Sequence, residues 1–135
     1  MLAGIGLGVL LGLFGQAYIN VLHLFPSVAE ILDRSDAQLA AIPHLRVSLL
    51  VMTVLIAPIA EEYLFRGLLY RALDREWGGW RAALGSAAFF AVYHPLLAWL
   101  PVGMLGLINS VMFKKTGRLA PAVAVHMVYN FIVMI

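Results

Sequence analysis

Long stretches without charge constrain this chain more than any other feature of its sequence. Residues 2–22 contain no Asp, Glu, Lys, Arg or His, and residues 82–113 contain a single one of these, His94. A helix needs about 20 apolar residues to cross the hydrocarbon core of a bilayer, which is roughly 30 Å thick. Because 63% of all residues are hydrophobic and only 12% are charged, the composition argues against a soluble globular fold. We therefore expect an all-α, polytopic membrane helix bundle.

The apolar stretches predict about five transmembrane helices. A polar connection, residues 23–45, separates the first two and has room for a short surface helix. It divides the chain into an N-terminal part, residues 1–45, and a helix-bundle core, residues 46–135. The last span is short because the chain ends at Ile135, which suggests a trimmed or minimal protein. The expected spans are Leu2–Leu22, residues 46–73 with a stop at Gly78 and Gly79, two short or tilted helices within residues 82–113 that turn near residues 99–101, and residues 119–135.

The basic residues predict the orientation of the bundle, since cytoplasmic loops carry an excess of Lys and Arg. Two loops hold most of them, whereas the connection and the start of the second span hold only Arg34 and Arg46. Five alternating spans then place the N-terminus inside and the C-terminus outside. The basic residues lie at segment ends and form no single patch, so we expect no nucleic-acid partner. The residues of the two basic loops are Arg71, Arg75, Arg81, Lys114, Lys115 and Arg118.

Glycines recur in the first span at Gly4, Gly8 and Gly12. Such four-residue spacing lets a second membrane helix approach closely. The general enrichment of glycine in membrane helices explains the pattern equally well. The spacing therefore leaves both explanations open.

The second span contains three residues whose transfer into the membrane is energetically unfavourable: Glu61, Glu62 and Arg66. On insertion scales each costs roughly 2.5 to 3.5 kcal/mol at the centre of a membrane helix. Glu62 and Arg66 stand four residues apart on one helical face, so we expect them to form an ion pair. Glu61 points about 100° away from Glu62 around the helix. It therefore needs a partner on another helix.

The polar partners available to Glu61 are His94 and, on one face of the last span, His126 and Asn130. Counting helical rise from the nearest basic residue gives depths of roughly 15, 20 and 12 Å for Glu61, His94 and His126. We therefore expect these side chains to share one layer. Taken singly, each histidine has a packing explanation, the amide can serve as a contact between helices, and the expected ion pair can be structural. Their joint occurrence at compatible depths favours a functional site.

Three ordered motifs carry a family resemblance. They are Glu61-Glu62-x-x-x-Arg66, Phe90-x-x-x-His94 and His126-x-x-x-Asn130, and they resemble those of the CPBP (Abi) family of intramembrane proteases. That family includes type II CAAX prenyl endopeptidases and proteins of bacteriocin processing and self-immunity. The resemblance runs from about residue 50 to the C-terminus, so residues 46–135 are identified as the catalytic core. It implies a bundle around a water-accessible cavity in which peptide bonds of membrane-associated substrates are hydrolysed.

The motif match also implies a role for each residue. Glu61 would be the catalytic carboxylate and His94 its partner in activating water, whereas His126 and Asn130 would face the oxyanion. The implied partners are the lipid bilayer and a membrane-associated peptide or protein, and the implied location is the cell membrane of a prokaryote as a multi-pass protein. Pro95 biases His94 away from helical backbone geometry. The His94 ring therefore need not lie where a regular helix would place it. The remaining motif residues, Glu62, Arg66 and Phe90, would support the site.

Two hydrolytic schemes are compatible with these residue types. In the metal-free scheme, Glu61 and neutral His94 hold one water, Glu61 removes its proton, and His126 and Asn130 stabilise the tetrahedral oxyanion. This scheme requires no cofactor. In the alternative, Glu61, His94 and His126 hold a zinc ion with water in the fourth position. The sequence contains no His-Glu-x-x-His motif, which would place two zinc ligands on one helix. The residue types alone do not decide between the metal-free and the zinc-dependent scheme.

Two further classes of protein place such residues in a membrane. A proton- or ion-coupled transporter uses acids and histidines at mid-depth, but it normally shows an inverted repeat that this sequence lacks. A non-catalytic immunity or interaction protein would keep the same fold without cleavage. The sequence leaves the substrate class open between prenylated C-terminal peptides, bacteriocin leaders and membrane proteins of the anti-sigma type.

Overall fold

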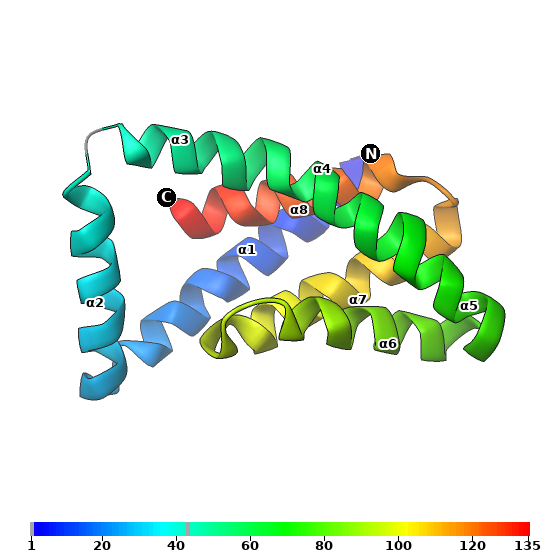
Figure 1. The fold of residues 1–135 in the computed structure, drawn as a ribbon, viewed down its shortest axis with the longest axis horizontal. Helices are drawn as coiled ribbons and strands as arrows, with labels where there is room; N and C mark the ends of the chain where they lie inside the picture. Colours follow the sequence, from blue (N-terminus) through cyan, green and yellow to red (C-terminus); the bar gives the residue numbers. More distant parts are fainter. Residues whose placement is uncertain (1, 43) are drawn as a thin grey trace.

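The computed structural model describes residues 2–42 and 44–135, in which every regular element is a helix (Figure 1). Pro43, within the expected connection, lies outside the described residues. The all-α prediction is confirmed. The α-helices are α1 Leu2–Leu22, α2 Pro26–Ala40, α3 Leu45–Val51, α4 Ala57–Glu62, α5 Arg71–Trp77, α6 Gly79–Val92, α7 Trp99–Thr116 and α8 Leu119–Met134, joined by π-helical η1 Met52–Ile56 and η2 Tyr63–Tyr70 and by 3-10 helix η3 Leu96–Ala98.

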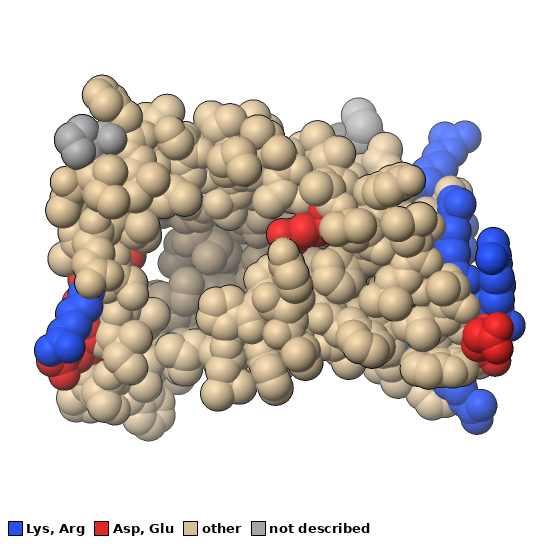
Figure 2. Space-filling model, in the orientation of Figure 1, with Lys and Arg blue, Asp and Glu red and all other residues tan. Residues whose placement is uncertain are grey.

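Among the described residues, three helices are long and apolar enough to cross a membrane: Gly4–Leu22, Leu45–Trp77 and Leu96–Thr116. α8 is a shorter apolar helix, and α6 has 14 residues. Large apolar side chains cover the outer surface, which lipid tails accept and water does not. Charged side chains gather at the two ends of the molecule and leave a nearly uncharged belt between them (Figure 2). These features describe a membrane helix bundle.

The second span is one continuous helix, Leu45–Trp77, interrupted by two π-helical segments. η1 and η2 flank α4, the short α-helical piece that carries Glu61 and Glu62. Wide turns of this kind appear frequently at functional sites. The helix ends at Trp77, just before Gly78, whose φ of 71° suits glycine. The expected end at Leu73 was therefore four residues too early, because nothing before Gly78 breaks the helix.

The turn between α6 and α7 lies at residues 93–98, earlier than the expected position near residues 99–101. α6 stops at Val92, and Pro95 disfavours helical geometry at His94. Pro101 instead falls in the first turn of α7, where a backbone N–H has no intrahelical partner. The turn lies earlier than expected because Pro101 is tolerated in the first turn of a helix, whereas Pro95 disfavours a helix at the residue before it.

α1 packs along α8, and α6 packs along α7. The seam between α1 and α8 is made by glycines. A Cβ added at Gly8 would lie 2.8 Å from the carbonyl oxygen of Val125, and one at Gly12 would lie 2.7 Å from Cβ of Ile132. The close approach that the glycine spacing permits is therefore realised. α1 braces the helix that carries His126 and Asn130.

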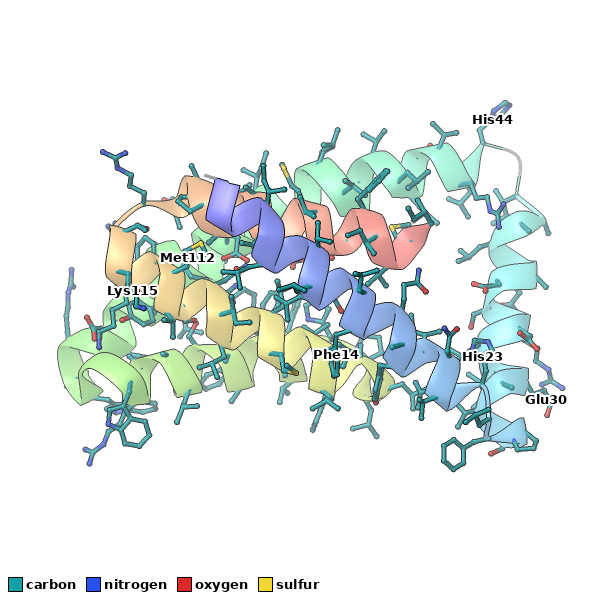
Figure 3. All side chains as sticks on the ribbon, turned by 180° about the vertical axis from the view of Figure 1, so that it is seen from behind. Phe14, His23, Glu30, His44, Met112 and Lys115 are labelled. Atoms are coloured by element: carbon teal, nitrogen blue, oxygen red, sulfur yellow. The ribbon has the colours of Figure 1, made fainter. Side chains whose placement is uncertain are left out.

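α2 crosses one end of the bundle and has no buried residue (Figure 1). Seen from behind, α1 runs obliquely across the bundle, with Lys115 at one end of the molecule and Glu30 of α2 at the other (Figure 3). The main apolar core lies between these ends. It consists of Leu11, Phe90, Val102, Leu105, Val125 and Tyr129.

Candidate active site

Glu62, at the end of α4, is the centre of a buried polar network. Its side chain is fully buried, and Oε1 accepts hydrogen bonds from Nη1 of Arg66 at 3.0 Å, Nδ2 of Asn109 at 2.8 Å and Nδ1 of His126 at 2.9 Å. Arg66 is also fully buried and donates from Nη2 to the carbonyl of Gly106 at 2.7 Å. The expected ion pair between Glu62 and Arg66 is confirmed. One carboxylate oxygen thus joins the second span to α7 and α8.

The two histidines turn the same ring nitrogen towards Glu61. A carboxylate only accepts hydrogen bonds, so the contact with Glu62 places a proton on Nδ1 of His126. Nδ1 of His94 lies 2.8 Å from the carbonyl oxygen of Phe90, which likewise only accepts. Nε2 of His126 and Nε2 of His94 then lie 3.8 and 3.9 Å from the same atom, Oε2 of Glu61. The structure therefore brings together Glu61 of α4, His126 of α8 and His94 of the turn after α6.

The separations around Oε2 of Glu61 are too long for direct hydrogen bonds. At separations above about 3.5 Å, a polar contact between two such groups is commonly made through a water molecule. The side chains of Glu61 and His94 keep 19% and 23% of their exposure, whereas His126 keeps only 2%. In Figure 2, acidic atoms interrupt the uncharged face beside a hollow. The site lies at the boundary between the buried network and the accessible surface.

Phe90 fills the space behind both histidines. It is fully buried, with its ring centroid 4.8 Å from that of His94 and 5.6 Å from that of His126. The guanidinium of Arg66 lies over the same ring, 4.6 Å from its centroid, and Phe65 meets the ring edge to face. Phe90 therefore packs against both imidazoles and against the guanidinium of Arg66.

Asn130 is placed differently from the other motif residues. Its Nδ2 donates to the carbonyl oxygen of Thr53 at 2.8 Å, which joins α8 to the π-helical segment η1. An amide NH2 group has two hydrogens, so a second donor remains. A cavity of about 580 Å³ lies beyond this contact, with Leu49 and Val133 in its wall, and Glu61 does not line it. The geometry makes Asn130 a link between helices with one donor to spare.

Asn109 is the residue of the network that sequence reasoning missed. It is fully buried on α7 and donates to Glu62 and, at 3.2 Å, to the carbonyl oxygen of Ala122. A signal existed, because an uncharged amide in the middle of a long apolar stretch is itself unfavourable in a membrane. A search limited to charged residues and histidines does not find Asn109, because its side chain is an uncharged amide.

The spacing of these side chains can be compared with the spacing of zinc ligands. Two ligand atoms of a tetrahedral zinc lie about 3.3 Å apart when each is about 2.0 to 2.1 Å from the metal. Both distances from Oε2 of Glu61 to the imidazoles of His94 and His126 are longer than this. No group of three or more His, Cys, Asp or Glu in the described part of the chain is arranged to hold a metal ion. As placed, the three side chains do not fit zinc, and we derive no step through a metal.

Comparison with known proteins gives the family. A family model described as type II CAAX prenyl endopeptidase Rce1-like matches residues 43–132. An uncharacterized 24.3 kDa protein of Escherichia coli is 30% identical over 135 residues, which cover 93% of this chain and 62% of that protein. The UPF0177 protein YbdI of Lactococcus lactis is 32% identical over 90 residues, 63% of this chain and 46% of that protein.

A third relative is the membrane-embedded CAAX protease MroQ of Staphylococcus aureus, 33% identical over 88 residues, 60% of this chain and 36% of that protein. The chain thus spans between 36% and 62% of the length of these relatives. No solved structure matches it. With two thirds of its residues matched by the family model, this membrane helix bundle belongs to the type II CAAX prenyl endopeptidase Rce1-like family.

Proposed function

We propose that this chain is an intramembrane endopeptidase that hydrolyses peptide bonds of membrane-associated substrates. Membership of a family described as prenyl endopeptidases supports the class of reaction. The observation that carries the proposal is the convergence of Nε2 of His94 and Nε2 of His126 on Oε2 of Glu61. A carboxylate and two imidazoles around one partly accessible point are the groups that hydrolysis of an amide needs.

In the proposed mechanism, Glu61 and His94 hold one water between them. Glu61 takes a proton from this water, and the resulting hydroxide attacks the carbonyl carbon of the peptide bond. When the carbon–nitrogen bond breaks, the protonated Glu61 returns its proton to the leaving amine. The products are a carboxylic acid and an amine, which exchange one proton to become a carboxylate and an ammonium, and the sum of the steps adds one water across the amide bond.

His126 stabilises the oxyanion through Nε2, which must carry a proton for this purpose. Because Nδ1 already donates to Glu62, the donating form is an imidazolium whose positive charge lies against a buried carboxylate. Asn130 contributes its second N–H while the first holds Thr53.

The proposed location is the cell membrane of a prokaryote, crossed several times, with the basic end of the bundle in the cytoplasm. The three relatives are bacterial proteins, and one is named a membrane-embedded CAAX protease. We propose prenylated CAAX-type or bacteriocin-type peptides as substrates.

The test compares the peptides released from membranes that carry wild-type protein, Glu61→Gln or the control Glu76→Gln. Glu76 is an exposed acid on α5 and has no part in the site. We expect the same cleavage products from wild type and Glu76→Gln and none from Glu61→Gln. Equal products from Glu61→Gln would refute the mechanism. If the wild-type protein cleaves no peptide but still protects cells against a bacteriocin, the non-catalytic immunity protein would be established instead.

A further inference from the structure

A groove of about 430 Å³ lies between α6 and α7, far along the bundle from Glu61. Leu84 of α6 and Leu107 and Val111 of α7 form its apolar walls. Leu84 and Val111 are exposed, so the groove opens on the outer surface of the bundle. In a membrane this surface faces lipid tails. The groove therefore has the position and the lining to receive a hydrocarbon chain.

The mouth of the groove is cationic and aromatic. Lys114 and Lys115, in the last turn of α7, line it together with Trp80. The ammonium of Lys114 lies against Gly79, where an added Cβ would be 2.6 Å from Nζ. Trp80 is 65% exposed, and the guanidinium of Arg81 lies over its ring at 5.9 Å. Tryptophan is enriched at the level of lipid headgroups, where one side of the ring is wet and the other apolar.

The positive charge at this end is not balanced by the protein. Six Lys and Arg residues stand against two acids, Asp74 and Glu76, which leaves a surplus of four positive charges. Among the described residues, the ion pairs within 4.0 Å involve none of these eight side chains. Figure 2 shows the basic atoms grouped at this end, and Figure 3 places Lys115 there. Each basic residue near an anionic membrane surface raises affinity roughly fivefold.

We propose that this groove binds one anionic glycerophospholipid. One acyl chain lies along Leu84, Leu107 and Val111, and the phosphate of the headgroup meets Lys114 and Lys115. A soluble anion would use only the mouth and leave the apolar walls empty, whereas a zwitterionic lipid would gain little from two lysines. The proposal goes beyond the peptidase activity and does not depend on it.

Trp80 provides a direct probe of occupancy. In a Trp77→Phe and Trp99→Phe background, Trp80 is the remaining tryptophan of the chain. The protein is reconstituted in phosphatidylcholine vesicles that contain a small, equal fraction of either phosphatidylglycerol or phosphatidylcholine with brominated acyl chains. We expect brominated phosphatidylglycerol to quench Trp80 with an apparent affinity at least roughly fivefold higher. Equal quenching by both lipids would mean a non-selective lipid shell and would overturn the proposal.

Matched variants locate the headgroup site. Lys114→Gln with Lys115→Gln should abolish the preference, while the corresponding double change to Arg should keep it. Arg118→Gln removes a cation of the same end that does not line the groove, and it should leave the preference within about twofold. Val111→Phe, which fills the groove, should weaken quenching by both lipids. Circular dichroism confirms that each variant keeps its helices. A preference that survives the double change to Gln would refute the assignment.

Discussion

Nδ1 of His126 lies 2.9 Å from Oε1 of Glu62, and both side chains are buried. This contact holds the imidazole so that its other nitrogen points at Glu61. Two neighbouring acids in one helix therefore have different surroundings. Glu62 accepts three hydrogen bonds within the buried network, whereas the side chain of Glu61 keeps 19% of its exposure. In the proposed mechanism, Glu62 orients the histidine and Glu61 reacts with water.

The two acids should respond differently to the same substitution. Glu62→Gln leaves the buried guanidinium of Arg66 without a charged partner and should lower the free energy of unfolding by about 3 to 5 kcal/mol. Glu61→Gln should change it by less than about 1 kcal/mol while reducing cleavage by about 10²- to 10⁴-fold. Denaturation in detergent micelles, followed by circular dichroism, measures the first effect, and a peptide cleavage assay the second. Equal stability losses would contradict the division of roles.

Asn109→Leu should impair both the network and the reaction. The change removes donors to Glu62 and to the carbonyl of Ala122 in a buried site, which costs about 1 to 3 kcal/mol. Because Glu62 then holds His126 less firmly, kcat should fall while KM stays near its wild-type value. The control is Asn20→Leu, the same change at an exposed amide of α1. Cleavage by Asn109→Leu as fast as by Asn20→Leu would show that Asn109 is only a packing residue.

The glycine seam offers a prediction on stability alone. Gly12→Ala places a Cβ against Ile132 and should destabilise the bundle by about 1 to 3 kcal/mol, since α1 and α8 must separate. Gly6→Ala is the matched control, because a Cβ there meets no atom within 4 Å among the described residues. It should be neutral or slightly stabilising, as alanine favours the helix. The two variants are compared by denaturation in the same detergent, and a reversed order would contradict the packing of α1 on α8.

Metal removal distinguishes the two hydrolytic schemes. We expect cleavage to survive exhaustive chelation and purified protein to contain no stoichiometric zinc by elemental analysis. The reason is the spacing of His94 and His126 from Oε2 of Glu61, which exceeds that of two zinc ligands. Activity that disappears on chelation and returns with zinc would establish the metal-dependent scheme.

Much of the fold and the meeting of Glu61, His94 and His126 could be predicted because periodic rules govern them. Helical rise relates sequence distance to depth, and a four-residue spacing places Arg66 beside Glu62. Apolar length alone predicted α1 with the bounds that the structure shows. Each of these predictions uses the sequence of a single helix, together with the rule that charged side chains inside a membrane are paired.

The features that sequence reasoning missed depend on contacts between helices. It assigned Glu62 a single partner, whereas Asn109 and His126 also donate to it from α7 and α8. The contact of the Asn130 amide with a carbonyl oxygen in η1 was not predicted, whereas its role at the oxyanion stays a prediction. Neither the π-helical segments nor the choice of acceptor can be read from local pattern, because both are decided by which helices pack together.

The wide turns of η1 and η2 set the rotational phase of α4 separately from the helix on either side. Inserting or deleting one residue in either segment rotates the helix beyond it by about 100° relative to the helix before it. Glu61 and Glu62 differ by the same angle, so a single such step in η1 turns one of them into the direction of the other and leaves its own direction to Ala60 or Tyr63, which carry no acid. Substitutions that preserve chain length keep both acids in place, whereas a one-residue length change in η1 leaves one of the two positions without a carboxylate.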